Sequence, residues 1–266
     1  MSATRPTIVI AGVGNGSGTG AATARVFAKA GYRVALIARG ADQLKKIVDE
    51  ITQAGGEAEA FPISSYSYAD VTAVFTLIKS HTWPSAPHTS PIRVALFNAV
   101  SVVFKSFFDV TPEDLASVAD VSVHSAFAFS RQAILAFREN HVDVSEGGSG
   151  SRGTLLFTGA TASLRGNTWT SAFSAGKHAT RALSQSLAKE FGKENIHVAH
   201  VIVDGGILTD FLVARQEEGE ARDNFVNNPD ARLDPESIAK SYLYLVGQNR
   251  SAWTWELDLR PAHEKW

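Results

Sequence analysis

Six short, continuously apolar runs, each separated from the next by a stretch of helical period, constrain the fold of this chain more than any other feature. The runs are TIVIAGV (7–13), YRVALIA (32–38), EAFPI (59–63), RVALFNA (93–99), TLLFTG (154–159) and HVAHVIV (197–203). Strands that are apolar on both sides suit a parallel sheet, because crossover helices cover both of its faces. The pattern predicts an α/β fold with a doubly wound parallel sheet.

The rest of the chain predicts one domain over residues 1–266, since no segment reads as a linker. Segment 81–91, with its three prolines, and segment 145–153, rich in glycine and serine, are expected to be surface loops. Residues 253–259 alternate apolar and polar side chains, which predicts a last strand. Segment 211–235 is mostly charged but begins apolar, so it is either a lid over the substrate or a solvated excursion.

Composition excludes several classes of function. A formal net charge of −2 and the lack of a basic face speak against nucleic-acid binding. The chain has no cysteine, which excludes disulfides and thiolate metal sites, and we expect no metal. The N-terminal apolar run reaches glycine after five residues, too early for a signal peptide or a membrane span. The expected state is a soluble, cytoplasmic protein that acts on a small molecule.

A glycine-rich loop, GVGNGSGTG, joins the first predicted strand to the first helix. Glycine permits positive φ and a close approach to a phosphate, and the N-terminus of the following helix attracts a pyrophosphate. The second strand then ends in Arg39, where an acidic residue would favour NAD and an arginine favours the 2′-phosphate of NADP. We predict NADP(H), held by Arg39 and by six residues of the loop: Gly14, Asn15, Ser17, Gly18, Thr19 and Gly20.

With these motifs in view, the chain resembles the classical short-chain dehydrogenase/reductase family over essentially its whole length. The resemblance rests on GNGSGTG (14–20), FNAV (97–100), VSVHSAF (121–127), FSAGK (173–177) and the later segment DGGILTD (204–210). It implies a Rossmann-type fold and a homodimer or homotetramer. It also implies that Asn98 and Ala99 lie beside the adenosine ribose, that Ser64 replaces an adenine-contacting aspartate, and that Ile207 and Thr209 contact the carboxamide and the phosphate.

The catalytic set of the family is Asn, Ser, Tyr and Lys, and this chain keeps only the last, as Lys177. Ser122, Ala160 and Phe173 stand at the other three positions. The family's tyrosine protonates the alkoxide that hydride transfer to a ketone creates, and a phenyl ring has no proton to donate. Losing a general acid costs on the order of 10²- to 10⁴-fold in rate, so ordinary ketone chemistry is expected to be feeble.

Three hypotheses account for an intact cofactor site beside an altered substrate site. The first is reduction of an already protonated imine or an iminium, which needs no proton donor. The pattern is similar to fungal homologues in indole alkaloid pathways, some of which also steer a four-plus-two cycloaddition. The second is a catalytically dead NADP(H) sensor or scaffold, and the third is a ketone reductase with another donor, such as Thr161 or water. For the first, the candidate active-site residues are Lys177, Arg131, Asn167, Trp169 and Phe173. Arg131 also fits a surface ion pair, and Trp169 also fits a cover over the core.

Overall fold

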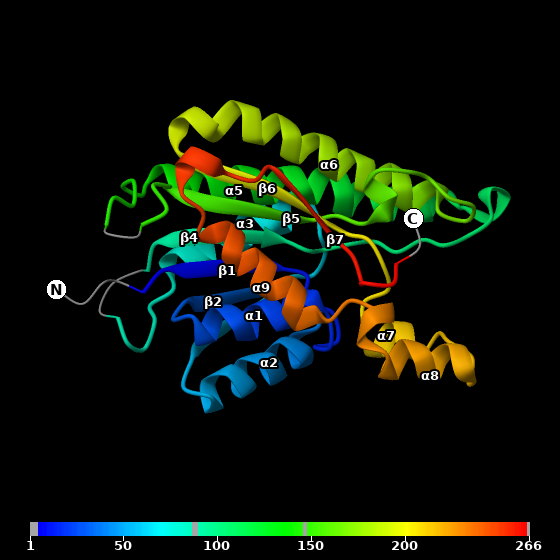
Figure 1. Ribbon diagram of the computed structural model, residues 1–266. Coiled ribbons are helices and arrows are strands. Elements are labelled where there is room, and N and C mark those ends of the chain that lie inside the picture. The colour runs from blue at the N-terminus through cyan, green and yellow to red at the C-terminus, as the bar shows by residue number, and fades with distance from the viewer. Residues whose placement is uncertain (1–4, 87–89, 146–147, 265–266) are drawn as a thin grey trace.

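The computed structural model describes residues 5–86, 90–145 and 148–264, and its centre is one seven-stranded sheet in which every pair of neighbours is parallel (Figure 1). The strand order is β3-β2-β1-β4-β5-β6-β7. Their bounds are β1 Thr7–Ala11, β2 Arg33–Ala38, β3 Glu57–Pro62, β4 Ile92–Phe97, β5 Gly153–Thr158, β6 Ile196–Val203 and β7 Glu256–Leu259. The sequence-based prediction of a doubly wound Rossmann-type sheet is confirmed.

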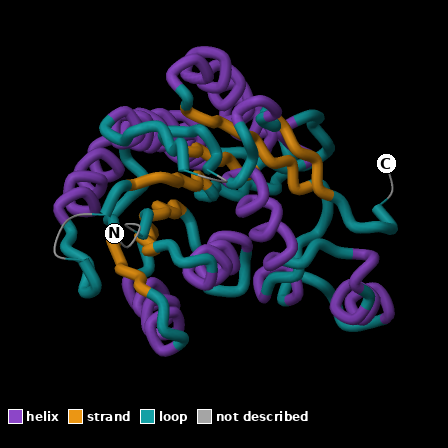
Figure 2. The backbone as a smooth tube through the Cα atoms, turned by 60° about the vertical axis from the view of Figure 1, so that its left-hand side comes forward, coloured by secondary structure: helices purple, strands orange, loops and turns teal. Residues whose placement is uncertain are grey.

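Helices cover both faces of this sheet. Their bounds are α1 Thr19–Lys29, α2 Ala41–Gln53, α3 Tyr68–Ser80, α4 Pro112–Ala119, α5 Ala126–Arg138, α6 Ser171–Phe191, α7 Asp210–Val213, α8 Glu220–Asn227 and α9 Pro235–Val246. In Figure 1, α3, α5 and α6 lie above the sheet and α1, α2 and α9 lie below it. The tube view shows the same layers turned by 60° (Figure 2).

Alternate residues of each central strand supply two separate cores. On β1, Val9 packs into the layer that contains α3 and α5, whereas Ile8 and Ile10 pack into the layer that contains α1, α2 and α9. Because side chains alternate across a strand, a strand between two helical layers must be apolar at every position. This is the physical origin of the continuous apolar runs in the sequence.

The chain changes direction in the sheet between β1 and β4. Strands β2 and β3 extend the sheet on one side of β1, and β4 begins its other side. In an open α/β sheet a ligand binds where the strand order reverses, beyond the carboxyl ends of the strands. The glycine loop follows β1 and residue Asn98 follows β4, so both lie at this point.

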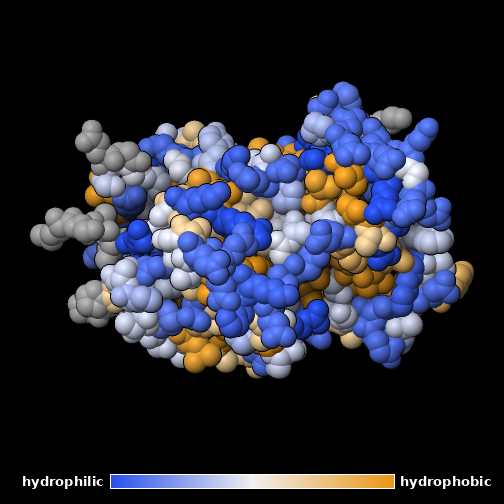
Figure 3. Space-filling model, turned by 90° about the horizontal axis from the view of Figure 1, so that it is seen from below, coloured by the Kyte–Doolittle hydropathy of each residue, from blue (hydrophilic) through white to orange (hydrophobic). Residues whose placement is uncertain are grey.

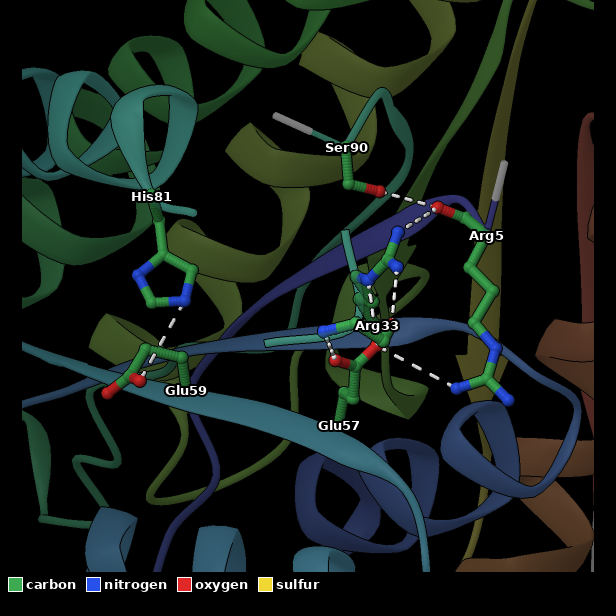
Figure 4. A network of polar contacts seen from close by, with 7 residues as sticks. Arg5, Arg33, Glu57, Glu59, His81 and Ser90 are labelled. Atoms are coloured by element: carbon green, nitrogen blue, oxygen red, sulfur yellow. Dashed lines mark hydrogen bonds and ion pairs between the residues drawn. The ribbon is translucent and has the colours of Figure 1, made fainter. Parts of the chain in front are cut away.

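The opposite end of the sheet is fastened by a polar network around Arg33 (Figure 4). The guanidinium of Arg33 is 4% exposed, pairs with Glu57 at 2.8 Å, and donates to the carbonyl of Arg5 and to the hydroxyl of Ser85. These bonds join the start of β2 to the start of β3 and to the segment that precedes β1. The network therefore stabilises the amino ends of these strands, whereas the ligand is expected at the carboxyl ends.

Several predicted boundaries differ in the structure. The last strand begins only at Glu256, because Trp253 stacks on His197 at 4.9 Å instead of joining the sheet. Segment 81–91, of which residues 87–89 lie outside the described part, is not wholly a surface loop, since Trp83 is buried against His81. In segment 145–153, residues 146–147 also lie outside the described part, and Gly153 belongs to β5.

Candidate active site

The glycine loop between β1 and α1 has the geometry of a phosphate cradle. Gly12, Gly14 and Gly16 have φ values of 93°, 59° and 95°, a region in which other residues are strained. A Cβ at Gly20 would lie 2.1 Å from the carbonyl oxygen of Gly12, so this contact admits no side chain. Gly18 caps α1 without a side-chain hydrogen bond, which leaves the first N–H groups of the helix for a ligand. These features fit the pyrophosphate of a dinucleotide.

A cavity of about 1050 Å³ runs from this loop along the carboxyl ends of the strands. Seen from below, apolar side chains gather toward this end of the molecule, which is the right-hand end of Figure 3. Most residues singled out in the sequence line the cavity: Gly14, Asn15, Gly18, Thr19, Gly20, Asn98, Asn167, Phe173, Lys177, Ile207 and Thr209.

Of the residues predicted at the adenosine end, Asn98 lines the cavity, whereas Arg39, Ser64 and Ala99 lie outside the lining. Arg39 is exposed at the end of β2, with its guanidinium 5.8 Å from the centre of the Tyr66 ring, so it is accessible to a phosphate. The Ser64 hydroxyl donates to Asp70 at 2.7 Å. Ala99 is 8% exposed, and a Cβ at Gly12 would lie 2.6 Å from its backbone nitrogen. Ala99 therefore supports the glycine loop from beneath.

Asn98 is held on both sides of its amide. Its Nδ2 donates to the carbonyl of Gly12 at 2.7 Å, and its Oδ1 accepts from the Thr158 hydroxyl at 2.8 Å. The fully buried Tyr242 hydroxyl lies 2.8 Å from Thr158, and burial raises the pKa of Tyr242, so this phenol stays protonated. The chain of bonds ties the ends of β4 and β5 to the glycine loop, and the Asn98 side chain positions that loop.

Lys177 is buried beside the missing tyrosine position. Its side chain lies on α6, where Lys177 is 7% exposed, and its Nζ donates to the carbonyl of Thr158 at 2.8 Å. The same Nζ is 5.9 Å from the centre of the Phe173 ring, one helical turn earlier. Burial lowers the pKa of Lys177 to about 8. The two other ammonium N–H groups suit the nicotinamide ribose.

The substrate end of the cavity has an aromatic wall. Phe173 packs edge-to-face on Phe104 at 5.2 Å, and Ala160 also lines the cavity. Phe104 was not predicted from the sequence, although the apolar run VSVVF after β4 could have drawn attention to it. A methyl group and a phenyl ring thus occupy the positions of the family's serine and tyrosine.

Three threonine hydroxyls of the cavity lining donate to acceptors within the protein. Thr158 donates to Asn98, and Thr170 donates to the carbonyl of Asn167 at 2.8 Å. Thr161 donates to the buried Asp204, whose other oxygen lies 2.7 Å from Arg260. Three threonines of the described cavity lining, Thr158, Thr161 and Thr170, therefore already donate to protein acceptors.

Two candidate active-site residues, Arg131 and Trp169, lie outside the described cavity lining. Arg131 is exposed on α5 and does not line the cavity, because the buried side of that helix is formed by neighbours such as Phe129 and Ala133. Trp169 is 67% exposed and also absent from the lining. Its carbonyl accepts from the Lys105 N–H, which joins its loop to the segment that carries Phe104.

The position of the family's asparagine is buried under α6. Ser122 lies in a π-helical segment, Asp120–Ser125, that connects α4 to α5. Its carbonyl accepts from Thr180 at 3.1 Å, and a Cβ at Gly176 would lie 2.7 Å from its hydroxyl. Ser122 lines no part of the cavity, so it does not restore the lost catalytic group.

The sheet order, the glycine loop at the strand reversal and Lys177 at the cavity define an NAD(P)-dependent oxidoreductase fold. Residues 7–220 match the family model for short chain dehydrogenases, and the chain belongs to this family. It is 26% identical over 248 residues to a 3alpha-hydroxysteroid dehydrogenase of Mediterraneibacter gnavus, covering 92% of this chain and 91% of that protein. Over 237 residues it is 28% identical to a probable tetrahydroxynaphthalene reductase of Zymoseptoria tritici, covering 88% and 80%.

Solved structures agree with the fold. A short-chain dehydrogenase from Rhodopseudomonas palustris has a TM-score of 0.74 and 28% identity, with 96% of this chain and 98% of that chain covered. An alcohol dehydrogenase from Thermococcus sibiricus has a TM-score of 0.77 at 21% identity, with 98% of both chains covered. Within the described residues, no helix is long and apolar enough to cross a membrane.

Proposed function

We propose that the protein is an NADPH-dependent reductase of an imine- or iminium-type intermediate in secondary, alkaloid-type metabolism. The observation that carries the proposal is the cavity lining, in which Ala160 and Phe173 stand at the positions of the family's serine and tyrosine. In the same lining, Thr158, Thr161 and Thr170 already donate to protein acceptors. When bound, the nicotinamide supplies a hydride. A ketone that receives it becomes an alkoxide and needs a proton, whereas an iminium becomes a neutral amine and needs none.

The side chains in the cavity have tasks that suit such a substrate. The rings of Phe173 and Phe104 offer apolar faces that attract a delocalised cation and exclude water. Lys177 holds the ribose of the cofactor, and burial lowers the pKa of its ammonium to about 8.

The preferred cofactor in this proposal is NADP(H). Arg39 stands at the end of β2 without an acidic residue beside it, its guanidinium is exposed, and Tyr66 holds it from one side. A planar guanidinium binds a phosphate with paired hydrogen bonds, so an extra 2′-phosphate would gain a direct partner there.

The proposal extends to a second step in the same cavity. The described cavity of about 1050 Å³ extends from the glycine loop to Phe104 and Phe173, so the product of the reduction stays against these rings while the cofactor occupies the loop end. Holding a flexible amine in one conformation would favour one product of a cycloaddition. Chiral chromatography of the products formed with and without the protein tests this step, and identical product ratios would count against it.

One double variant separates the candidate functions. Phe173→Tyr combined with Ala160→Ser restores the family's acid and its carbonyl-positioning hydroxyl. For iminium substrates, kcat/KM should stay level or fall, because the transition state has no alkoxide to protonate. For ketones, we expect a gain on the order of 10²-fold or more.

The wild-type protein provides the control for this experiment. NADPH oxidation should be measured with cyclic iminium salts and with a ketone panel. Turnover of ketones alone would support the third hypothesis, a ketone reductase with another donor. Turnover of neither class, with NADPH still bound, would support the sensor or scaffold. A large gain of the double variant on iminium substrates would refute the proposal.

A further inference from the structure

A buried carboxylate lies next to the cavity lining at the end of β6. Asp204 is 2% exposed, while its neighbours Val203 and Gly205 both line the cavity. Oδ2 of Asp204 lies 2.7 Å from the guanidinium of Arg260, and Oδ1 accepts a hydrogen bond from the Thr161 hydroxyl. One carboxylate oxygen therefore faces a cation, and the other is joined to the cavity lining through Thr161.

Thr161 is held at the position next to Ala160. It opens the short 3₁₀ turn Thr161–Ser163, and its carbonyl accepts from the N–H of Leu164 at 3.0 Å. The N–H of Ala160 donates to the Ser163 hydroxyl at 3.1 Å. Ala160 stands at the position of the family's serine, so Thr161 carries the next hydroxyl along the chain, and it lines the cavity as well.

The Thr161 hydroxyl differs from those of the other two threonines in its open acceptor positions. Thr158, whose own proton is engaged elsewhere, accepts from the Tyr242 hydroxyl. The Thr170 hydroxyl accepts from the N–H of Asn167. Within the described part of the chain, no group donates to the Thr161 hydroxyl, and its one proton already has an acceptor. Since a hydroxyl oxygen has one proton and two lone pairs, Thr161 offers a ligand in the cavity only lone pairs.

We propose that Thr161, oriented by Asp204, is the hydrogen-bond acceptor that selects a substrate with an N–H on its cationic nitrogen, a protonated cyclic imine and not an N-alkylated iminium. The inference rests on the proposed imine reduction and narrows its substrate class. An iminium N–H is a charged donor, and hydrogen bonds of charged groups are the stronger ones. The N–H persists through the reaction, because the hydride adds to carbon and the electron pair of the C=N bond moves to nitrogen. Asp204 is a positioning residue that acts through Thr161.

Binding of two amines that cannot be reduced tests the selectivity without turnover. Calorimetry on the protein saturated with NADP⁺ compares protonated tetrahydroisoquinoline with its N,N-dimethyl ammonium ion, which has no N–H. The ratio of the two affinities should fall by about ten-fold in Thr161→Val, because this is the size of one hydrogen bond to a charged group. The bulk of the methyl groups is the same for both proteins and cancels in this comparison.

Two control variants separate the hydrogen bond from other effects of substitution. Thr161→Ser keeps a hydroxyl beside Asp204 and should keep the wild-type ratio of affinities. Thr72→Val removes a hydroxyl from α3, which contributes nothing to the described cavity lining, and it should also bind both probes like wild type. A thermal melt verifies that each variant is folded.

The variant Asp204→Asn tests the positioning role. Arg260 and Arg165 face the other side-chain oxygen, so the asparagine should keep its carbonyl oxygen there and turn its amide NH₂ toward Thr161. The Thr161 hydroxyl then accepts from this amide, and its proton is free to point into the cavity. The preference for the secondary ammonium should disappear although the hydroxyl is still present. A merely structural role of Asp204 would weaken the binding of both probes alike and leave the ratio unchanged.

Reduction assays separate this inference from the proposed function. With NADPH, wild-type kcat/KM should be higher for dihydroisoquinolinium than for its N-methyl derivative, and Thr161→Val should narrow the gap by about ten-fold. If wild type binds the secondary ammonium selectively but reduces neither iminium ion, the proposed reduction fails and the acceptor site stands. An unchanged ratio of affinities in folded Thr161→Val would overturn the acceptor site, whether or not the protein reduces imines. If Asp204→Asn does not fold, Thr161→Val decides alone.

Discussion

The variant Lys177→Met tests how much the buried ammonium of Lys177 lowers the folding stability of the protein. This ammonium is buried, and its pKa falls from the ordinary 10.5 to about 8. Since one pKa unit corresponds to about 1.4 kcal/mol, the folded protein carries a penalty of about 3 kcal/mol for keeping this charge at pH 7. Methionine removes the penalty with a similar volume, but it leaves the carbonyl of Thr158 without its donor, at a cost of about 2 kcal/mol.

The sign of the pH dependence follows from the direction of the shift. Between pH 8 and 10.5 the unfolded state binds more protons at this lysine than the folded state, so wild-type stability rises with pH in that interval. At pH 7 the variant should be about 1 kcal/mol more stable than wild type. At pH 10.5, where the lysine is neutral in the folded state and half protonated in the unfolded state, it should be about 1.5 kcal/mol less stable.

Urea unfolding at a series of pH values measures this crossover. Lys189→Met is the matched control, because Lys189 is exposed on the same helix. The difference in unfolding free energy between Lys189→Met and wild type should not depend on pH, whereas the difference between Lys177→Met and wild type should. If the two lysine variants show the same pH dependence, the burial argument for Lys177 is refuted. NADPH binding should weaken only in Lys177→Met, which would show that the ammonium is kept for function at the expense of stability.

Two further predictions concern the cofactor and acid stability. Arg39→Ala should weaken NADPH binding by about ten-fold or more and change NADH binding little, since only NADPH carries the 2′-phosphate. Calorimetry measures both affinities, and an unchanged ratio between them would contradict the cofactor assignment. Buried His200 donates to or accepts from Glu256 at 3.0 Å, and burial lowers the pKa of His200 to about 4. Folding stability should therefore fall by about 3 kcal/mol as the pH drops from 6.5 to 4. Urea titrations of His200→Gln should show a shallower loss over this interval, and an equally steep loss would refute the role of His200.

The sequence by itself determined the architecture and the cofactor cradle. The apolar run at 7–13 and its counterparts are local patterns, and their continuity follows directly from burial on both faces of a sheet. Gly20 is likewise fixed by a local turn, in which a side chain would meet the Gly12 carbonyl. The spacing of Phe173 and Lys177 places both on one face of α6 whatever surrounds that helix.

Only the tertiary structure decided which side chains share the cavity. Arg131 and Trp169 looked equivalent to Asn167 as candidates, yet helix packing and the path of one loop leave the first two exposed and bring Asn167 into the lining. Phe104 meets Phe173, and Asp210 meets Asn15, across long stretches of chain that no local period relates. Periodicity reports which face of an element is buried, whereas the partners on that face depend on how distant elements pack.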